Sequence, residues 1–269
     1  MIIIWGSKGS GKTSFLSALF FAIQQKKEWV MYPEDEESRK FIQNGYEAFI
    51  KEKVFPLTTM PDDINRVFQF DIGKEPTNLI SKIKYKYRLG TYKSIKTCFL
   101  DPSGEFFEQP DKEKVFGNFI SEHIQKAQGI ICLIDPDRND SISENDKSYF
   151  TLLFENFSKI RSLLTSSSSP SLDKIPLPLA ICISKIDMHK EYIDSSKAYA
   201  EKIIGDFALS IIYNYFDQNY INYFACSSVG FKEDGTPNII QDSTGTLRPA
   251  EIIKPINLIE PIEWIMKKI

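Results

Sequence analysis

The pattern of apolar and polar residues along the chain predicts short strands that alternate with amphipathic helices. Short apolar runs have the length and composition of strands: 2–5, 67–72, 83–89, 95–100, 129–134, 179–183 and 220–224. Apolar residues at helical spacing predict helices after residue 13 and at about 34–53, 115–128, 143–164, 195–216 and 255–269. This alternation predicts an α/β fold, in which helices flank a mostly parallel sheet.

The order of these elements predicts one domain over residues 1–269, because no shift in composition marks a boundary. Four consecutive serines after Thr165 predict a flexible surface loop at about 165–176. Residues 229–250 are rich in Gly, Thr, Pro and Asp, and this composition predicts an exposed hairpin or loop.

Composition and charge exclude several functional classes. The chain has 269 residues, 42% of them hydrophobic, and a net charge of -3, which does not favour general nucleic-acid binding. No apolar run approaches the roughly 20 residues that cross a bilayer, and residues 1–5 lack the length and basic start of a signal peptide. Four cysteines without a CxxC pair predict buried, reduced thiols. We therefore expect a cytoplasmic protein without integral membrane contact.

The segment after the first apolar run matches the P-loop pattern, GxxxxGK[ST], and a helix follows it. Its backbone amides would surround a phosphate group, the Lys12 ammonium would bridge the β- and γ-phosphates, and the Thr13 hydroxyl would bind Mg²⁺. A chance match in such a chain is on the order of one in a hundred. The phosphate-contacting residues predicted here are Gly6, Ser7, Lys8, Gly9, Ser10, Gly11, Lys12, Thr13 and Ser14. GTPases, ATPases and kinases all use this loop, so the motif does not choose among them.

A second motif, Asp101-Pro102-Ser103-Gly104, follows the apolar run at 95–100. A carboxylate at the end of a strand can hold Mg²⁺ through water, so Asp101 is a candidate metal ligand. The Gly104 amide would then donate to the γ-phosphate. The alternative is an ordinary turn before a helix.

The motif Ser184-Lys185-Ile186-Asp187 also follows an apolar run, and it indicates guanine. The Asp187 carboxylate can accept hydrogen bonds from guanine N1–H and N2–H₂, which adenine does not offer as a pair. The stem of Lys185 can stack along the base. After the last apolar run, a backbone amide of Cys226, Ser227 or Ser228 could donate to guanine O6. The alternative interpretation of the motif at 184–187 is a charged surface turn.

Taken in this order, the motifs at 6–13, 101–104, 184–187 and 226–228 resemble those of Ras-like small GTPases, within the translation-factor-related P-loop class. The pattern is most similar to that of prokaryotic Ras-like GTPases with an enlarged switch I region. The resemblance implies a sheet of six or more strands, with GTP or GDP and Mg²⁺ bound at the carboxyl ends of the strands. It also implies effector and regulatory proteins that contact the switch regions. Thr59, with Thr58 as second choice, would complete the Mg²⁺ shell.

The sequence departs from the family pattern at several positions. The distance between Thr13 and Asp101 implies an insertion at about 28–94, before switch II. Glu105 stands where Ras-like enzymes place the glutamine that orients the attacking water, so we expect slow hydrolysis. Lys8 replaces a small residue, and either obstructs an arginine finger, places a cation near the phosphates or is an exposed loop lysine. The residues expected to act in hydrolysis are Lys12, Thr59, Gly104 and Glu105.

Two alternatives to a slow GTPase switch stay open at this point. The first is a module that binds GTP or GDP with little or no hydrolysis, and Glu105 is the main argument for it. The second is a P-loop ATPase in which the motif at 184–187 is accidental.

Overall fold

The part of the chain that the structure, a computed structural model, describes comprises several separate ranges. They are residues 1–7, 9–57, 67–74, 94–100, 123–124, 126–137, 150, 154, 157–158, 160–162, 164 and 174–269. Within 94–100 the backbone is described throughout, and Thr97 is the residue whose side chain is described.

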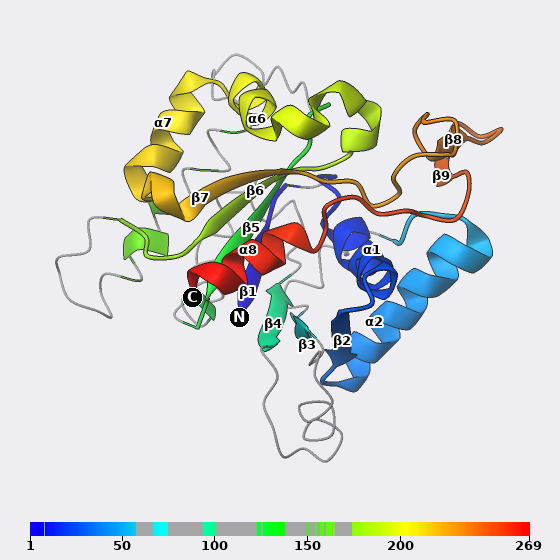
Figure 1. The fold of residues 1–269 in the computed structure, drawn as a ribbon, viewed down its shortest axis with the longest axis horizontal. Helices are drawn as coiled ribbons and strands as arrows, with labels where there is room; N and C mark the ends of the chain where they lie inside the picture. The colour runs from blue at the N-terminus through cyan, green and yellow to red at the C-terminus, as the bar shows by residue number, and fades with distance from the viewer. Residues whose placement is uncertain are drawn as a thin grey trace.

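The centre of the fold is a parallel sheet of four strands in the order β1-β5-β6-β7 (Figure 1). Its strands are β1 Ile2–Trp5, β5 Gly129–Ile134, β6 Leu179–Ile183 and β7 Ile221–Ala225. The first three have the predicted bounds, and the fourth lies one residue later than predicted. Strands β1, β5 and β6 are continuous apolar runs, because helices cover both faces of a parallel sheet. The α/β fold with a P-loop after its first strand is therefore confirmed.

A second sheet has three antiparallel strands in the order β2-β3-β4. These are β2 Trp29–Pro33, β3 Val67–Lys74 and β4 Ser94–Leu100. Strand β4 lies beside β1, so the second sheet adjoins the parallel one (Figure 1). The sequence analysis missed β2, although its Trp-Val-Met-Tyr sequence has high strand propensity. The predicted strand at 83–89 lies outside the described residues.

The described helices include α1 Lys12–Gln25, α2 Glu36–Tyr46, α6 Ser196–Ile204, α7 Asp206–Tyr215 and α8 Glu260–Lys268. Helix α2 begins where Asp35 Oδ1 accepts a hydrogen bond from the Ser38 amide at 2.7 Å, and a π-helical segment, Glu47–Glu52, continues it. The single helix predicted at 195–216 is wrong. Gly205, with φ 77° and ψ 157°, breaks it into α6 and α7.

Alternate residues of β1 face opposite sides of the sheet, which gives the domain three layers. Ile3 and Trp5 pack with residues of α6 and α7 on one side. Ile2 and Ile4 pack with residues of α1, α8 and the β2-β3-β4 sheet on the other. The layer arrangement is visible in Figure 1, where α6 and α7 lie on one side of the sheet and α8 and α1 on the other.

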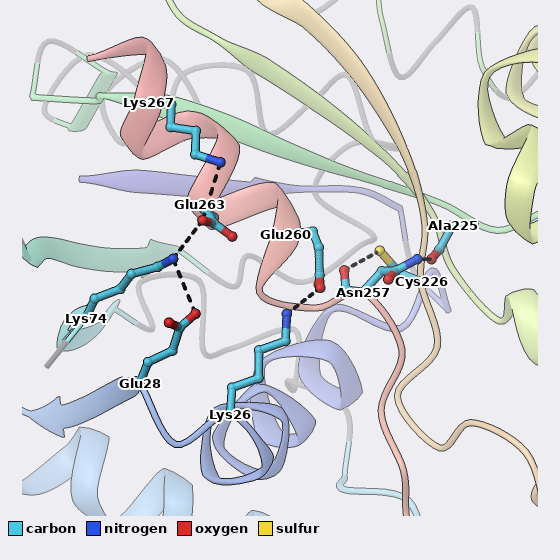
Figure 2. A network of polar contacts seen from close by, with 9 residues as sticks. All are labelled: Lys26, Glu28, Lys74, Ala225, Cys226, Asn257, Glu260, Glu263 and Lys267. Carbon is cyan, nitrogen blue, oxygen red and sulfur yellow. Dashed lines mark hydrogen bonds and ion pairs between the residues drawn. The ribbon is translucent and has the colours of Figure 1, made fainter. Parts of the chain in front are cut away.

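Helix α8 contacts the end of α1 and the antiparallel sheet through charged side chains (Figure 2). Glu260 pairs with Lys26 at 2.5 Å, and Glu263 accepts from Lys74 at 2.9 Å. Lys74 also lies 3.3 Å from Glu28. These side chains are partly exposed, so each pair contributes no more than about 1 kcal/mol, and the apolar face of α8 supplies most of the attachment. Among the described residues, no helix has the length and apolar character needed to cross a membrane.

Candidate functional site

The loop between β1 and α1 has the tight backbone path that the P-loop pattern predicts. A Cβ atom at Gly6 would lie 2.6 Å from Ser10 Oγ and 2.8 Å from Leu133 O, so a side chain does not fit there. Gly11 caps α1 with φ 86°, a left-handed conformation that glycine adopts at little cost. These two glycines allow the loop to turn tightly between β1 and α1.

The Lys12 side chain folds back over this loop. Its Nζ donates to the carbonyl oxygens of Gly6 at 3.0 Å and Ser7 at 2.9 Å, and Lys12 is buried. Ser10 Oγ donates to Ser7 O at 2.9 Å. The cap residue of α1, Gly11, has no side chain that could satisfy the amides of the first turn, so the partial positive charge at the start of the helix adds to that of the Lys12 ammonium. This arrangement suits an anion of the size of a phosphate group.

The predicted Mg²⁺ site is described only at Thr13, which is partly exposed in the first turn of α1. A hydroxyl oxygen at the end of a phosphate loop is a suitable Mg²⁺ ligand. Lys8, Thr58, Thr59, Asp101, Gly104 and Glu105 lie outside the described residues.

Ser184 brings the predicted motif at 184–187 close to the P-loop. Its amide and its Oγ both donate to Ile134 O, at 2.8 and 2.9 Å, which ties the loop after β6 to the end of β5. A Cβ atom at Gly11 would lie 4.0 Å from Ser184 Cβ. The structure thus brings together the two motifs, although more than 170 positions separate Gly11 and Ser184 in the sequence.

Asp187 is a deeply buried carboxylate, with 4% of its surface exposed. Ser227 Oγ donates to its Oδ1 at 2.5 Å, and no other side chain of the described residues is recorded as donating to this carboxylate. Burial raises the pKa of Asp187, while the hydrogen bonds from Ser227 and from its own amide, and the charges of His189 and Lys185, oppose that rise. The carboxylate is therefore held in one orientation and retains capacity for further donors.

The loop at 226–228 is held from two sides. Ser227 Oγ accepts from the Gly230 amide at 2.8 Å, and the Ser227 amide donates to Ile256 O at 3.1 Å. Ser228 is partly exposed, and within the described part of the chain no hydrogen bond is recorded for its amide. Of these three residues, Ser228 therefore has the amide best placed to meet a ligand.

Cys226 supports this loop from inside the protein. Its Sγ donates to Asn257 O at 3.2 Å, and Asn257 Nδ2 donates to Ala225 O at 2.9 Å (Figure 2). Asn257 has a left-handed backbone with φ 51°, which lets its amide side chain reach the end of β7. The thiols of Cys132, Cys182 and Cys226 are buried and free, as predicted, while the Cys98 side chain is not described.

The sequence analysis missed Asp135, which follows β5 directly. Its Oδ2 lies 2.5 Å from Lys185 Nζ. A signal was present in the sequence, because Asp135 follows an apolar strand at the same edge of the sheet as the predicted motifs. Two residues later, Asp137 Oδ1 lies 2.7 Å from His189 Nε2.

Comparisons with known proteins give weak matches among solved structures. No protein-family model and no curated protein sequence matches the chain. The GTPase-like domain of Ski7 from S. cerevisiae, bound to GTP, is 13% identical with a TM-score of 0.41; the match covers 84% of this chain and 42% of that one. The SRβ–GTP/SRX complex from Chaetomium thermophilum is 13% identical with a TM-score of 0.39, over 86% of this chain and 92% of that one. The chain thus spans less than half the length of the Ski7 chain that it matches.

Proposed function

We propose that this chain binds GTP and GDP with Mg²⁺, hydrolyses GTP slowly and acts as a nucleotide-dependent switch in the cytoplasm. One observation supports this most directly. The Asp187 carboxylate is buried and accepts a hydrogen bond from Ser227, which fixes its orientation. Asp187 belongs to the loop that begins at Ser184, and Ser184 lies against the P-loop. A guanine-reading carboxylate and a phosphate-binding loop need this arrangement to bind the two ends of one nucleotide.

The phosphates would occupy the loop between β1 and α1. The Lys12 ammonium would exchange its present partners, the carbonyls of Gly6 and Ser7, for β- and γ-phosphate oxygens. Thr13, Asp101 and Thr59 would hold Mg²⁺, which supplies charge neutralisation at the β- and γ-phosphates when bound.

The base would lie against the loops after β6 and β7. Asp187 would accept from guanine N1–H and N2–H₂, and the amide of Ser228 would donate to O6. The Lys185 side chain is 43% exposed, and its stem would cover one face of the base. Adenine presents an acceptor, N1, and a C–H group at the corresponding positions and would give the buried carboxylate no donor from the base.

Hydrolysis and switching would depend on Thr59, Gly104 and Glu105. Segments that contact the γ-phosphate become ordered with GTP and relax after hydrolysis, and effector or regulatory proteins would recognise this difference. An ionised Glu105 can accept a proton or hydrogen bond from water but cannot donate to the transition state, so turnover should be slow.

The first test is displacement of a fluorescent GDP analogue in the presence of Mg²⁺. GTP should displace it at far lower concentration than ATP. Asp187→Asn should weaken GDP binding on the order of 100-fold, because a neutral amide cannot accept from both guanine donors. The same variant should gain affinity for xanthosine diphosphate, whose C2 carbonyl accepts from the new amide.

The exposed Asp194 provides a matched control, since Asp194→Asn should bind GDP as the unchanged chain does. Equal displacement by GTP and ATP would contradict the guanine assignment and favour a P-loop ATPase.

The second test separates an enzyme from a binding module. Single-turnover GTP hydrolysis should be slow in the unchanged chain and faster in Glu105→Gln, by at least about tenfold, because glutamine can both donate and accept at the attacking water. Hydrolysis that is absent from both forms would instead support a GTP- or GDP-binding module without turnover.

A further inference from the structure

We propose that Asp135 is a positioning residue for guanine recognition, which acts by holding the Lys185 side chain across the base site. This inference rests on the proposed function. Asp135 was not among the residues that the sequence motifs identified, and it directly follows β5 rather than lying in either base-contacting loop.

The Asp135 side chain has donors at both carboxylate oxygens. Oδ2 accepts from Lys185 Nζ at 2.5 Å, and Oδ1 accepts from the Asp137 amide at 3.1 Å. The carboxylate is 9% exposed, whereas the Lys185 side chain is 43% exposed. The buried member of the pair is therefore the aspartate, and it determines where the more exposed lysine side chain lies.

The backbone around Lys185 is also held by the end of β5. Ser184 donates twice to Ile134 O, and Lys185 itself has a left-handed φ of 54°, which is unfavourable for a residue with a Cβ atom. The carbonyl of Lys185 accepts from the Met188 amide at 2.9 Å. The two consecutive residues Ile134 and Asp135 thus fix the backbone and the side chain of the base-binding loop together.

This contact has a direct consequence for binding. A free lysine side chain loses rotational freedom when it packs along a base, and that entropy reduces affinity. The ion pair with Asp135 restricts the stem before the nucleotide arrives.

The test is a double-mutant cycle on the full chain, with the dissociation rate of N-methylanthraniloyl-GDP as the readout. Asp135→Asn should speed dissociation by about three- to tenfold when Lys185 is present. In a Lys185→Met background, which keeps an apolar stem without the charge, the same change should alter the rate less than about twofold. Asp137→Asn is the matched control, because Asp137 pairs with His189 instead, and it should leave the rate unchanged.

Asp135→Glu keeps the charge on a longer side chain, and it replaces Asp135→Asn in the cycle if Asp135→Asn does not fold. Its rate should lie between those of the unchanged chain and Lys185→Met, and the difference should disappear in the Lys185→Met background. Equal effects of an Asp135 change in both backgrounds, or no effect when Lys185 is present, would overturn the inference while leaving the proposed function standing. An unchanged chain that fails to bind the GDP probe would overturn the proposed function and this inference with it.

Discussion

At the scale of single residues, Asp187 combines deep burial with a need for negative charge. Burial favours the protonated carboxyl and raises its pKa, whereas guanine donors require the ionised form. Ser227, Lys185 and His189 offset part of the cost of that charge. The nucleotide would supply further donors, so binding and deprotonation of Asp187 should be coupled.

This coupling predicts that GDP affinity falls as the pH is lowered, beginning above the usual aspartate pKa of about 3.9. The effect on folding has the opposite sign. Because the folded-state pKa is raised, the contribution of Asp187 to stability is greatest at low pH and is lost as the pH rises through that pKa. GDP dissociation constants measured between about pH 4 and pH 8 would test the predicted loss of affinity. Asp187→Asn with xanthosine diphosphate should lack this acid loss, and the same loss in both would contradict the assignment.

The motifs predicted that the loops at 6–13, 184–187 and 226–228 contribute to one site, because the chemistry of phosphate and guanine demands particular groups. Ser184 and Ser227 were predicted within these motifs, and the structure supplies their partners, Ile134 O and Asp187. The position of Asp135 after an apolar strand was a signal in the sequence, but its partner could not be assigned from the sequence alone. Its partner, Lys185, lies in the loop after β6, and the parallel register that pairs Ile134 with Ile183 brings the two residues together.

At the scale of elements, the start of β5 depends on a close approach by α8. A Cβ atom added at Gly129 would lie 2.6 Å from Ile265 Cγ2. Both residues are buried, so neither can move into solvent to relieve the contact. The absence of a side chain at Gly129 therefore sets how closely the last helix packs on the sheet.

Gly129→Ala should lower the free energy of unfolding by about 1–3 kcal/mol through overpacking. Ile265→Ala should cost about 2–5 kcal/mol by leaving a cavity. The double variant should cost less than the sum, because the new methyl group occupies part of that cavity. Urea unfolding of the four proteins measures the coupling, and strictly additive costs would contradict the packing argument.

The strands were predicted more accurately than the helix ends. Buried parallel strands are continuous apolar runs, so β5 and β6 have the predicted bounds. The predicted helix at 255–269 begins only at Glu260, because Ile256 and Asn257 use their backbone groups to hold Ser227 and Cys226. Helical periodicity cannot detect such a competing tertiary contact.

At the scale of the whole molecule, the candidate site exists only in the folded chain. Its parts follow β1, β5, β6 and β7, and the contacts among them join residues far apart in sequence. A ligand that binds there stabilises the folded state and has no equivalent site in the unfolded state.

GDP with Mg²⁺, at 100 times its dissociation constant, should therefore raise the free energy of unfolding by about 2.7 kcal/mol. ADP at the same concentration should have little effect. Lys12→Ala should remove most of the stabilisation, since it deletes the charge proposed to bind the phosphates. Thermal unfolding with each nucleotide would test this, and equal shifts with GDP and ADP would contradict guanine selectivity.

The position of α8 also bears on how the protein is made. Ile262 and Ile265, near the end of the chain, share one apolar cluster with Ile2 and Ile4, near its beginning. During synthesis, the first strand emerges from the ribosome long before the helix that covers it. The apolar face of β1 therefore lacks the part of its cover that α8 supplies until that helix has been made, and a partly covered apolar surface is the kind that chaperones bind and that aggregates when they are scarce.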